Sequence, residues 1–157
     1  MAYHDDLLAQ ALQLVHASPA TQLALRRAVS AAYYAVFHYL IAEATSNWSN
    51  IPLRTALARA YDHGVMKTAS NRILNPKDFP YTGEDPAVVA KLRFVAQAFS
   101  QLQEDRHFAD YNLTKDLDSV EALTQVKSAE KIFNTWPTIR AEQIAQAYLV
   151  SLLVKRV

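Results

Sequence analysis

The stretch AVVAKLRFVAQAFSQLQEDRHFADY, residues 87–111, decides the fold class. Its large apolar residues recur at spacings of four, three, four and three, which is the period of one buried helical face: Val88, Leu92, Val95, Phe99 and Leu102. Two further steps of four along the same line reach Arg106 and then Asp110. The stretch therefore predicts a long amphipathic helix whose buried face ends in a guanidinium and a carboxylate.

Prolines, glycines and short polar clusters divide the rest of the chain into further segments. We expect helices over about 4–17, 20–45, 52–63 and 87–111, a fifth that begins at Asp116 or Asp118 and ends near Trp136, and a sixth over 138–155. We also expect a loop over 75–86 and helical or irregular structure over 65–74. We expect Ser18 to cap the second helix, Gly64 to break or bend the chain after the third, and Pro137 to open the last.

The composition supports the same fold class. Alanine, the best helix former, is the most frequent residue, and there are only two glycines, fewer than turn-rich β architectures need. So few glycines also exclude a dinucleotide-binding glycine loop and a Walker-type phosphate loop. We therefore predict an all-α bundle of five to six helices in which residues 1–157 form one domain.

Other features of the sequence narrow the function classes. The chain has no cysteine, and its 16 Lys and Arg residues nearly balance its 15 Asp and Glu residues. The absence of cysteine excludes disulfide scaffolds and thiolate metal sites. The balanced charge argues against a strongly basic nucleic-acid surface and an acidic tail but leaves a local charged patch open. No histidine or carboxylate pair has a known metal-ligand spacing, so we expect no metal and no cofactor. With no visible signal peptide or membrane span, we expect a cytoplasmic protein that does not enter the membrane.

The predicted second helix carries a polar and aromatic stripe. On a helical wheel four of its residues fall within one narrow face: Arg27, Ser30, Tyr34 and His38. The stripe predicts either a partly exposed seam or a dimer face on which the tyrosine hydroxyl is hydrogen-bonded.

The charges at the end of the fourth predicted helix allow two interpretations. Burying an unpaired charge is costly, so Arg106 must be paired, hydrogen-bonded or directed into a cleft. One interpretation is an ion pair with Asp110 that closes the core. The other is that Arg106 forms the floor of a phosphate-binding cleft, since the fork of donors on a guanidinium suits an anion.

Two segments are similar to the HEPN-domain family. LRRAVSAAYYAVFH, residues 25–38, is similar to the pattern of its second helix, and RHFADYN, residues 106–112, resembles its arginine-containing segment on a later helix. The resemblance implies an all-α bundle that dimerises so that the arginine helices meet in a shared cleft. Many members are metal-independent RNases with an Arg-x4–6-His motif. They serve as toxins, phage-defence effectors or RNA-processing factors, and a nucleotidyltransferase antitoxin often accompanies them.

The resemblance assigns Arg106 as the arginine of that motif. The histidine of the motif would fall at Tyr111, Asn112 or Leu113, and none of these is histidine. The nearby His107 lies about 100° away around the helix. The catalytic candidates implied are Arg106, His107 and Asp110, and the binding candidates are Arg27, Ser30, Tyr34, His38, Tyr111 and Asn112.

Three functions follow from these observations. The first is a HEPN-like module that binds RNA, a nucleotide or a protein partner through a homodimer cleft, within a toxin–antitoxin or phage-defence system. The second is a metal-independent endoribonuclease that uses Arg106 with His107 or His38. The third is a structural helical adaptor. The missing motif histidine favours binding over cleavage, because transesterification of RNA needs a group that moves protons near neutral pH, as imidazole does.

Overall fold

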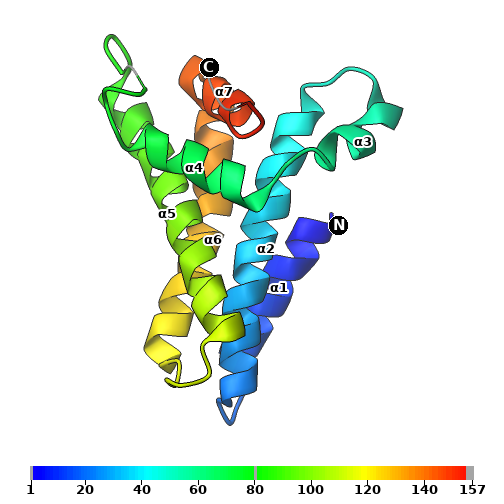
Figure 1. The fold of residues 1–157 in the computed structure, drawn as a ribbon, viewed down its shortest axis with the longest axis vertical. Helices are drawn as coiled ribbons and strands as arrows, with labels where there is room; N and C mark the ends of the chain where they lie inside the picture. The colour runs from blue at the N-terminus through cyan, green and yellow to red at the C-terminus, as the bar shows by residue number, and fades with distance from the viewer. Residues whose placement is uncertain (1, 80, 155–157) are drawn as a thin grey trace.

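The computed structural model describes residues 2–79 and 81–154, and this part of the chain contains helices and no strand. The described residues form seven α-helices, whose arrangement is drawn in Figure 1. They are α1 (Tyr3–Val15), α2 (Gln22–Ser46), α3 (Arg54–Ala58), α4 (His63–Ile73), α5 (Pro86–Tyr111), α6 (Ser119–Ile139) and α7 (Gln143–Ser151), with a 3₁₀-helix at Ile51–Leu53 before α3. The all-α prediction is confirmed.

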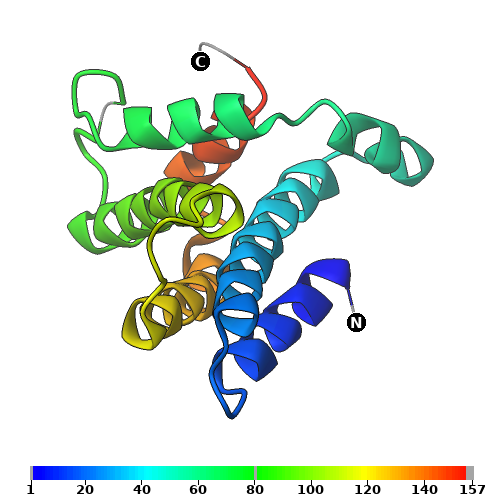
Figure 2. The ribbon, with the colours of Figure 1, turned by 60° about the horizontal axis from the view of Figure 1, so that its bottom comes forward.

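The long helix α2 lies at the centre of the bundle. Helices α1, α5 and α6 pack along it, as the views in Figures 1 and 2 agree. Apolar residues on several sides of α2 are buried, among them Leu25, Val36 and Leu40. A helix that is apolar on most sides needs cover on most sides, which explains its central position.

Helix α4 begins beside α2 and crosses toward α5. Figure 1 shows α3 projecting beside the upper end of α2, after which the chain turns back into α4. The turn ends at Asp62, whose Oδ1 accepts a hydrogen bond from the Val65 backbone N–H at 3.0 Å. This cap starts α4 at His63 and so fixes that histidine at the helix end nearest α2.

Two predictions about the first half of the chain were wrong. Ser18 does not cap the second helix, because Thr21 does so, with its Oγ1 accepting from the Ala24 N–H at 3.1 Å. The helix expected over 52–63 ends at Ala58, and Gly64 does not break the chain. Gly64 lies in the first turn of α4, where the Asp62 cap stabilises the helix in spite of the low helix propensity of glycine.

The prediction that Pro137 opens the last helix was also wrong. Helix α6 continues through Pro137 to Ile139, and α7 begins at Gln143. Proline deprives the carbonyl four residues earlier of its donor, but close to a helix end this loss ends the helix rather than starting a new one. The Thr138 hydroxyl donates to the Thr135 carbonyl at 2.6 Å within this last turn. Lys155, the expected end of the last helix, and Pro80, in the expected loop, lie outside the described residues.

Candidate functional site

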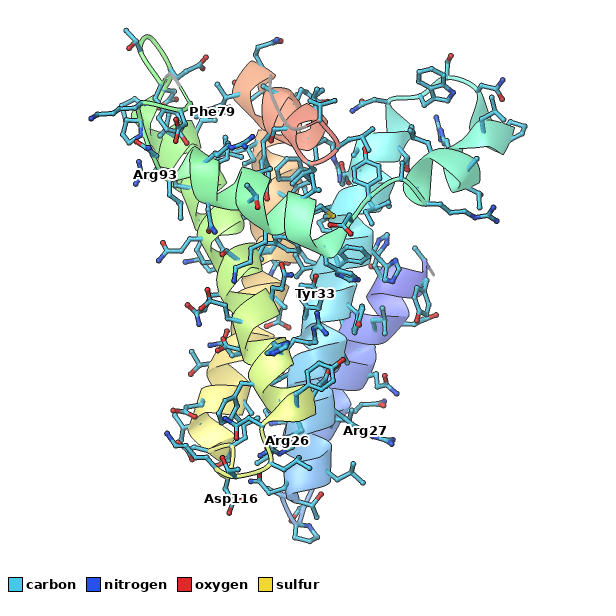
Figure 3. All side chains as sticks on the ribbon, viewed as in Figure 1. Arg26, Arg27, Tyr33, Phe79, Arg93 and Asp116 are labelled. Atoms are coloured by element: carbon cyan, nitrogen blue, oxygen red, sulfur yellow. The ribbon has the colours of Figure 1, made fainter. Side chains whose placement is uncertain are left out.

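Arg106 lies between α5 and α2, where its guanidinium rests on two tyrosine rings. Its carbon Cζ is 5.1 Å from the centroid of the Tyr33 ring and 5.7 Å from that of Tyr34. Only 12% of the side chain is exposed. Figure 3 shows Tyr33 between the two helices at mid-height of the bundle. The helical period therefore continues past Leu102 as predicted, and α2 supplies an aromatic bed for the charge.

The protein leaves the donors of Arg106 only partly used. The nearest carboxylate oxygen, Asp110 Oδ2, is 3.8 Å from Nη1, which is an ion pair but too long for a hydrogen bond. The same oxygen lies 3.4 Å from the Ser30 hydroxyl. The Arg106 Nε is buried and has no acceptor among the described residues. A ligand could therefore reach only the terminal nitrogens, and these have donors to spare.

The structure adds a residue that sequence analysis missed, His63. Its Nδ1 is 2.5 Å from the hydroxyl of Tyr33, and its ring stacks on Phe37 with 4.0 Å between centroids. Tyr33 is fully buried, and its other polar neighbour, Arg106, has no lone pair to offer. The phenol must therefore donate to Nδ1, which leaves the proton of the neutral imidazole on Nε2. No described residue accepts from Nε2.

The environment holds both members of this pair neutral. Burial raises the pKa of Tyr33 well above its usual range, and the nearby Arg106 only partly opposes this. Burial also lowers the pKa of His63, the positive charge of Arg106 lowers it further, and Asp62 opposes both. A neutral imidazole next to a guanidinium offers one N–H donor without adding a second positive charge. We refer to Tyr33, Tyr34, His63, Arg106 and Asp110 as the Arg106 cluster.

The predicted stripe on α2 is only partly assembled at this cluster. Ser30 and Tyr34 contact Asp110 and Arg106, as described above. His38 stacks near Tyr34 at 6.4 Å between centroids and meets the Tyr3 ring edge-on at 5.1 Å. Burial, and to a lesser extent His63 and His4, lower the pKa of His38. His38 thus extends the cluster as an aromatic surface rather than as a charged one.

Arg27, the remaining member of the stripe, does not join the cluster. It is exposed and makes no hydrogen bond or ion pair with the described residues. The preceding residue, Arg26, points instead to the end of α5, where it donates to the carbonyls of Ala109 at 3.0 Å and Asn112 at 2.7 Å. Figure 3 shows the two arginines on different sides of α2.

The other candidates after Arg106 also lie apart from the cluster. His107 is exposed and packs against Tyr111, with 4.9 Å between ring centroids. Both line an open depression of about 490 Å³ together with Glu104 and Asn112. Asn112 ends α5, and its side-chain oxygen accepts from the Thr114 N–H at 3.1 Å. The structure therefore does not bring His107, Tyr111 or Asn112 to the guanidinium of Arg106.

Within 2–79 and 81–154 no group of three or more histidine, aspartate or glutamate side chains is arranged to hold a metal ion. In the same part of the chain no helix has the length and apolar character that crossing a membrane requires.

Comparison of the chain with protein-family models, with curated proteins and with solved structures found no match. The HEPN resemblance therefore stays a prediction from the two sequence segments quoted above.

Proposed function

We propose that this chain is a HEPN-like module that binds single-stranded RNA through the Arg106 cluster. The observation that carries the proposal is a guanidinium with unused donors that rests on two tyrosine rings, one of which is hydrogen-bonded to the neutral imidazole of His63. Such an arrangement suits one phosphate group, because the guanidinium supplies charge and both side chains supply directed donors.

The aromatic surface beside the cluster supports RNA over an isolated phosphate or a protein carboxylate. The rings of Tyr34, His38 and Tyr3 follow one another across α2 and α1, and Tyr3 is 64% exposed. Single-stranded nucleic acids bind to such surfaces by stacking bases on aromatic rings while the backbone lies on positive charge. The nearly balanced charge of the whole chain implies that binding depends on this local site.

The test is binding of a fluorescein-labelled oligouridylate of about ten nucleotides, measured by fluorescence anisotropy. Arg106→Gln should weaken binding about tenfold or more, as expected when a hydrogen-bonded charge contact to a phosphate is lost. Arg27→Gln is the matched control, since it removes the same charge from an exposed arginine and should change the affinity by less than about threefold. Equal losses in the two variants would refute the site, and competition by uridine monophosphate alone would identify a nucleotide instead.

A second candidate is a metal-independent endoribonuclease, and the position of His63 favours it. His63 brings an imidazole close to Arg106 from another helix, replacing the histidine that the family motif would place after the arginine. Arg106 would stabilise charge on the phosphorane. However, the neutral imidazole has its lone pair occupied by the Tyr33 hydroxyl, so it has none left to accept the 2′-hydroxyl proton. Binding without cleavage therefore fits the geometry better.

Cleavage assays in EDTA distinguish the two candidates. The endoribonuclease predicts that labelled RNA is cut by the wild type and that His63→Ala removes the activity, whereas His107→Ala and His38→Ala retain it. The binding module predicts no cleavage by any of the four proteins. A nucleotidyltransferase encoded beside this chain would support a toxin–antitoxin role for either candidate.

A further inference from the structure

We infer that the Arg106 cluster takes up a proton on His63 when it binds a phosphate, so that binding strengthens as the pH falls. This inference depends on the proposed function, because it concerns the same phosphate site. It adds a regulatory property that binding alone does not require.

The hydrogen bond between Tyr33 and His63 is the structural basis. In the free protein the phenol donates to Nδ1, so protonation of the ring would force the phenol to become the acceptor. The buried phenolic hydrogen would then have no acceptor among the described residues, which is costly. A phosphate bound at Arg106 would bring a negative charge close to the imidazolium and so offset this cost.

The charged groups around His63 point in the same direction. Three elements face it: α4 contributes the preceding Asp62, α2 contributes Tyr33, Tyr34 and His38, and α5 contributes Arg106. The cation of Lys67, one turn along α4, is already paired with Glu104 of α5 at 3.0 Å. Arg106 is therefore the main positive charge that opposes an imidazolium at His63, and its effect on the histidine pKa is a lowering.

An anion bound to Arg106 removes that opposition. A bound phosphate partly neutralises the guanidinium and attracts an imidazolium directly, so the pKa of His63 in the complex must exceed that in the free protein. By linkage, a group whose pKa rises on binding takes up a proton in the interval between the two pKa values. Within this interval the affinity for the phosphate rises by up to about tenfold for each unit by which the pH falls.

The experiment is calorimetric titration of oligouridylate into the protein at several pH values from 5.5 to 8. Each titration is carried out in two buffers of different ionisation enthalpy. The phosphodiesters and uracil bases of this probe do not titrate over that range, so protons bound on association come from the protein side. We expect uptake of up to one proton per bound strand, and we expect His63→Gln to bind RNA without proton uptake. His107→Gln, which replaces an exposed histidine outside the Arg106 cluster, should keep the uptake.

The outcomes separate this inference from the proposed function. A binding heat that is the same in both buffers, with an affinity that does not change with pH, would overturn the inference and leave the proposed function intact. Uptake that persists in His63→Gln would also overturn it, because another group would then bind the proton. Absence of binding at every pH would overturn both. A nuclear magnetic resonance titration of His63 in the wild type, with and without the probe, gives the same decision if the variant fails to fold. A pKa that does not rise in the complex contradicts the inference.

Discussion

Replacing Arg26 by alanine should destabilise the fold strongly, although Arg26 is not part of the Arg106 cluster. Its guanidinium closes the C-terminal end of α5, where helix carbonyls have no partners within the helix. It donates to the carbonyls of Ala109 at 3.0 Å, Asn112 at 2.7 Å and Lys115 at 2.6 Å. One side chain therefore holds the end of α5 and the connection to α6 against α2.

The magnitude follows from the surroundings of each acceptor. Ala109 is 2% exposed, so its carbonyl cannot readily exchange the arginine for water, and a buried carbonyl left without a donor costs about 1–3 kcal/mol. The Asn112 and Lys115 carbonyls belong to exposed residues and recover water, so each loss costs about 0.5 kcal/mol. The expected loss of unfolding free energy is about 2–4 kcal/mol.

The assay is urea unfolding followed by circular dichroism at 222 nm, with Arg27→Ala as the matched control. Both variants remove one arginine from the first half of α2, but Arg27 is exposed and has no partner among the described residues. Arg27→Ala should change the unfolding free energy by less than about 0.5 kcal/mol. The dependence on urea should have the same slope in both variants, because the buried surface is unchanged. Equal destabilisation by the two substitutions would refute the assigned role of Arg26.

Three further predictions concern the core, an acidic side chain and assembly. Tyr148→Phe should lower the unfolding free energy by about 1 kcal/mol, because the buried Tyr148 hydroxyl lies 2.7 Å from the Ser70 hydroxyl. In urea unfolding, the double variant with Ser70→Ala should be less destabilised than the sum of the two single variants. Burial raises the pKa of Asp105, so the folded state binds this proton more tightly than the unfolded chain does. The unfolding free energy therefore falls as the pH rises and the carboxyl group ionises. Asp105→Asn should therefore be more stable than the wild type at pH 7 and lose that gain below about pH 4, while the exposed control Asp116→Asn should show no gain. Light scattering should report a homodimer of twice the 17.6 kDa chain mass, and a monomer at micromolar concentration would contradict the shared cleft implied by the HEPN resemblance.

The helical architecture could be predicted because it depends on local signals. The spacing from Val88 to Asp110 fixes one face of α5 without reference to any other part of the chain. The errors occurred where several local signals compete. Pro137 is compatible with a helix start or a last turn. Gly64 is compatible with a break or a first turn, and there the Asp62 cap decides between them. The cap at Asp62 was visible in the sequence as an acceptor followed by a helical segment.

The candidate site was harder to predict, because it joins side chains from three helices. Arg106 and Asp110 share one face of α5, and so their proximity followed from the helical period alone. His63 meets Tyr33 only because the chain reverses after α3 and α4 begins beside α2. No spacing in the sequence encodes that reversal. The sequence contained one useful signal, an aspartate cap directly before a histidine, which predicts an imidazole fixed at a helix N-terminus.

The position of that histidine gives the site its chemical character. An imidazolium at a helix N-terminus is disfavoured by the helix dipole, and here Arg106 disfavours it as well. Had His107 completed the site, the imidazole would be exposed to solvent and would lie apart from Tyr33. His63 instead stays neutral until an anion arrives, so the free protein avoids placing two positive charges against the same tyrosine ring. In such a site, ligand binding and protonation are coupled. A substitution that leaves Tyr33, His63 and Arg106 in contact cannot change the response to ligand without also changing the response to pH.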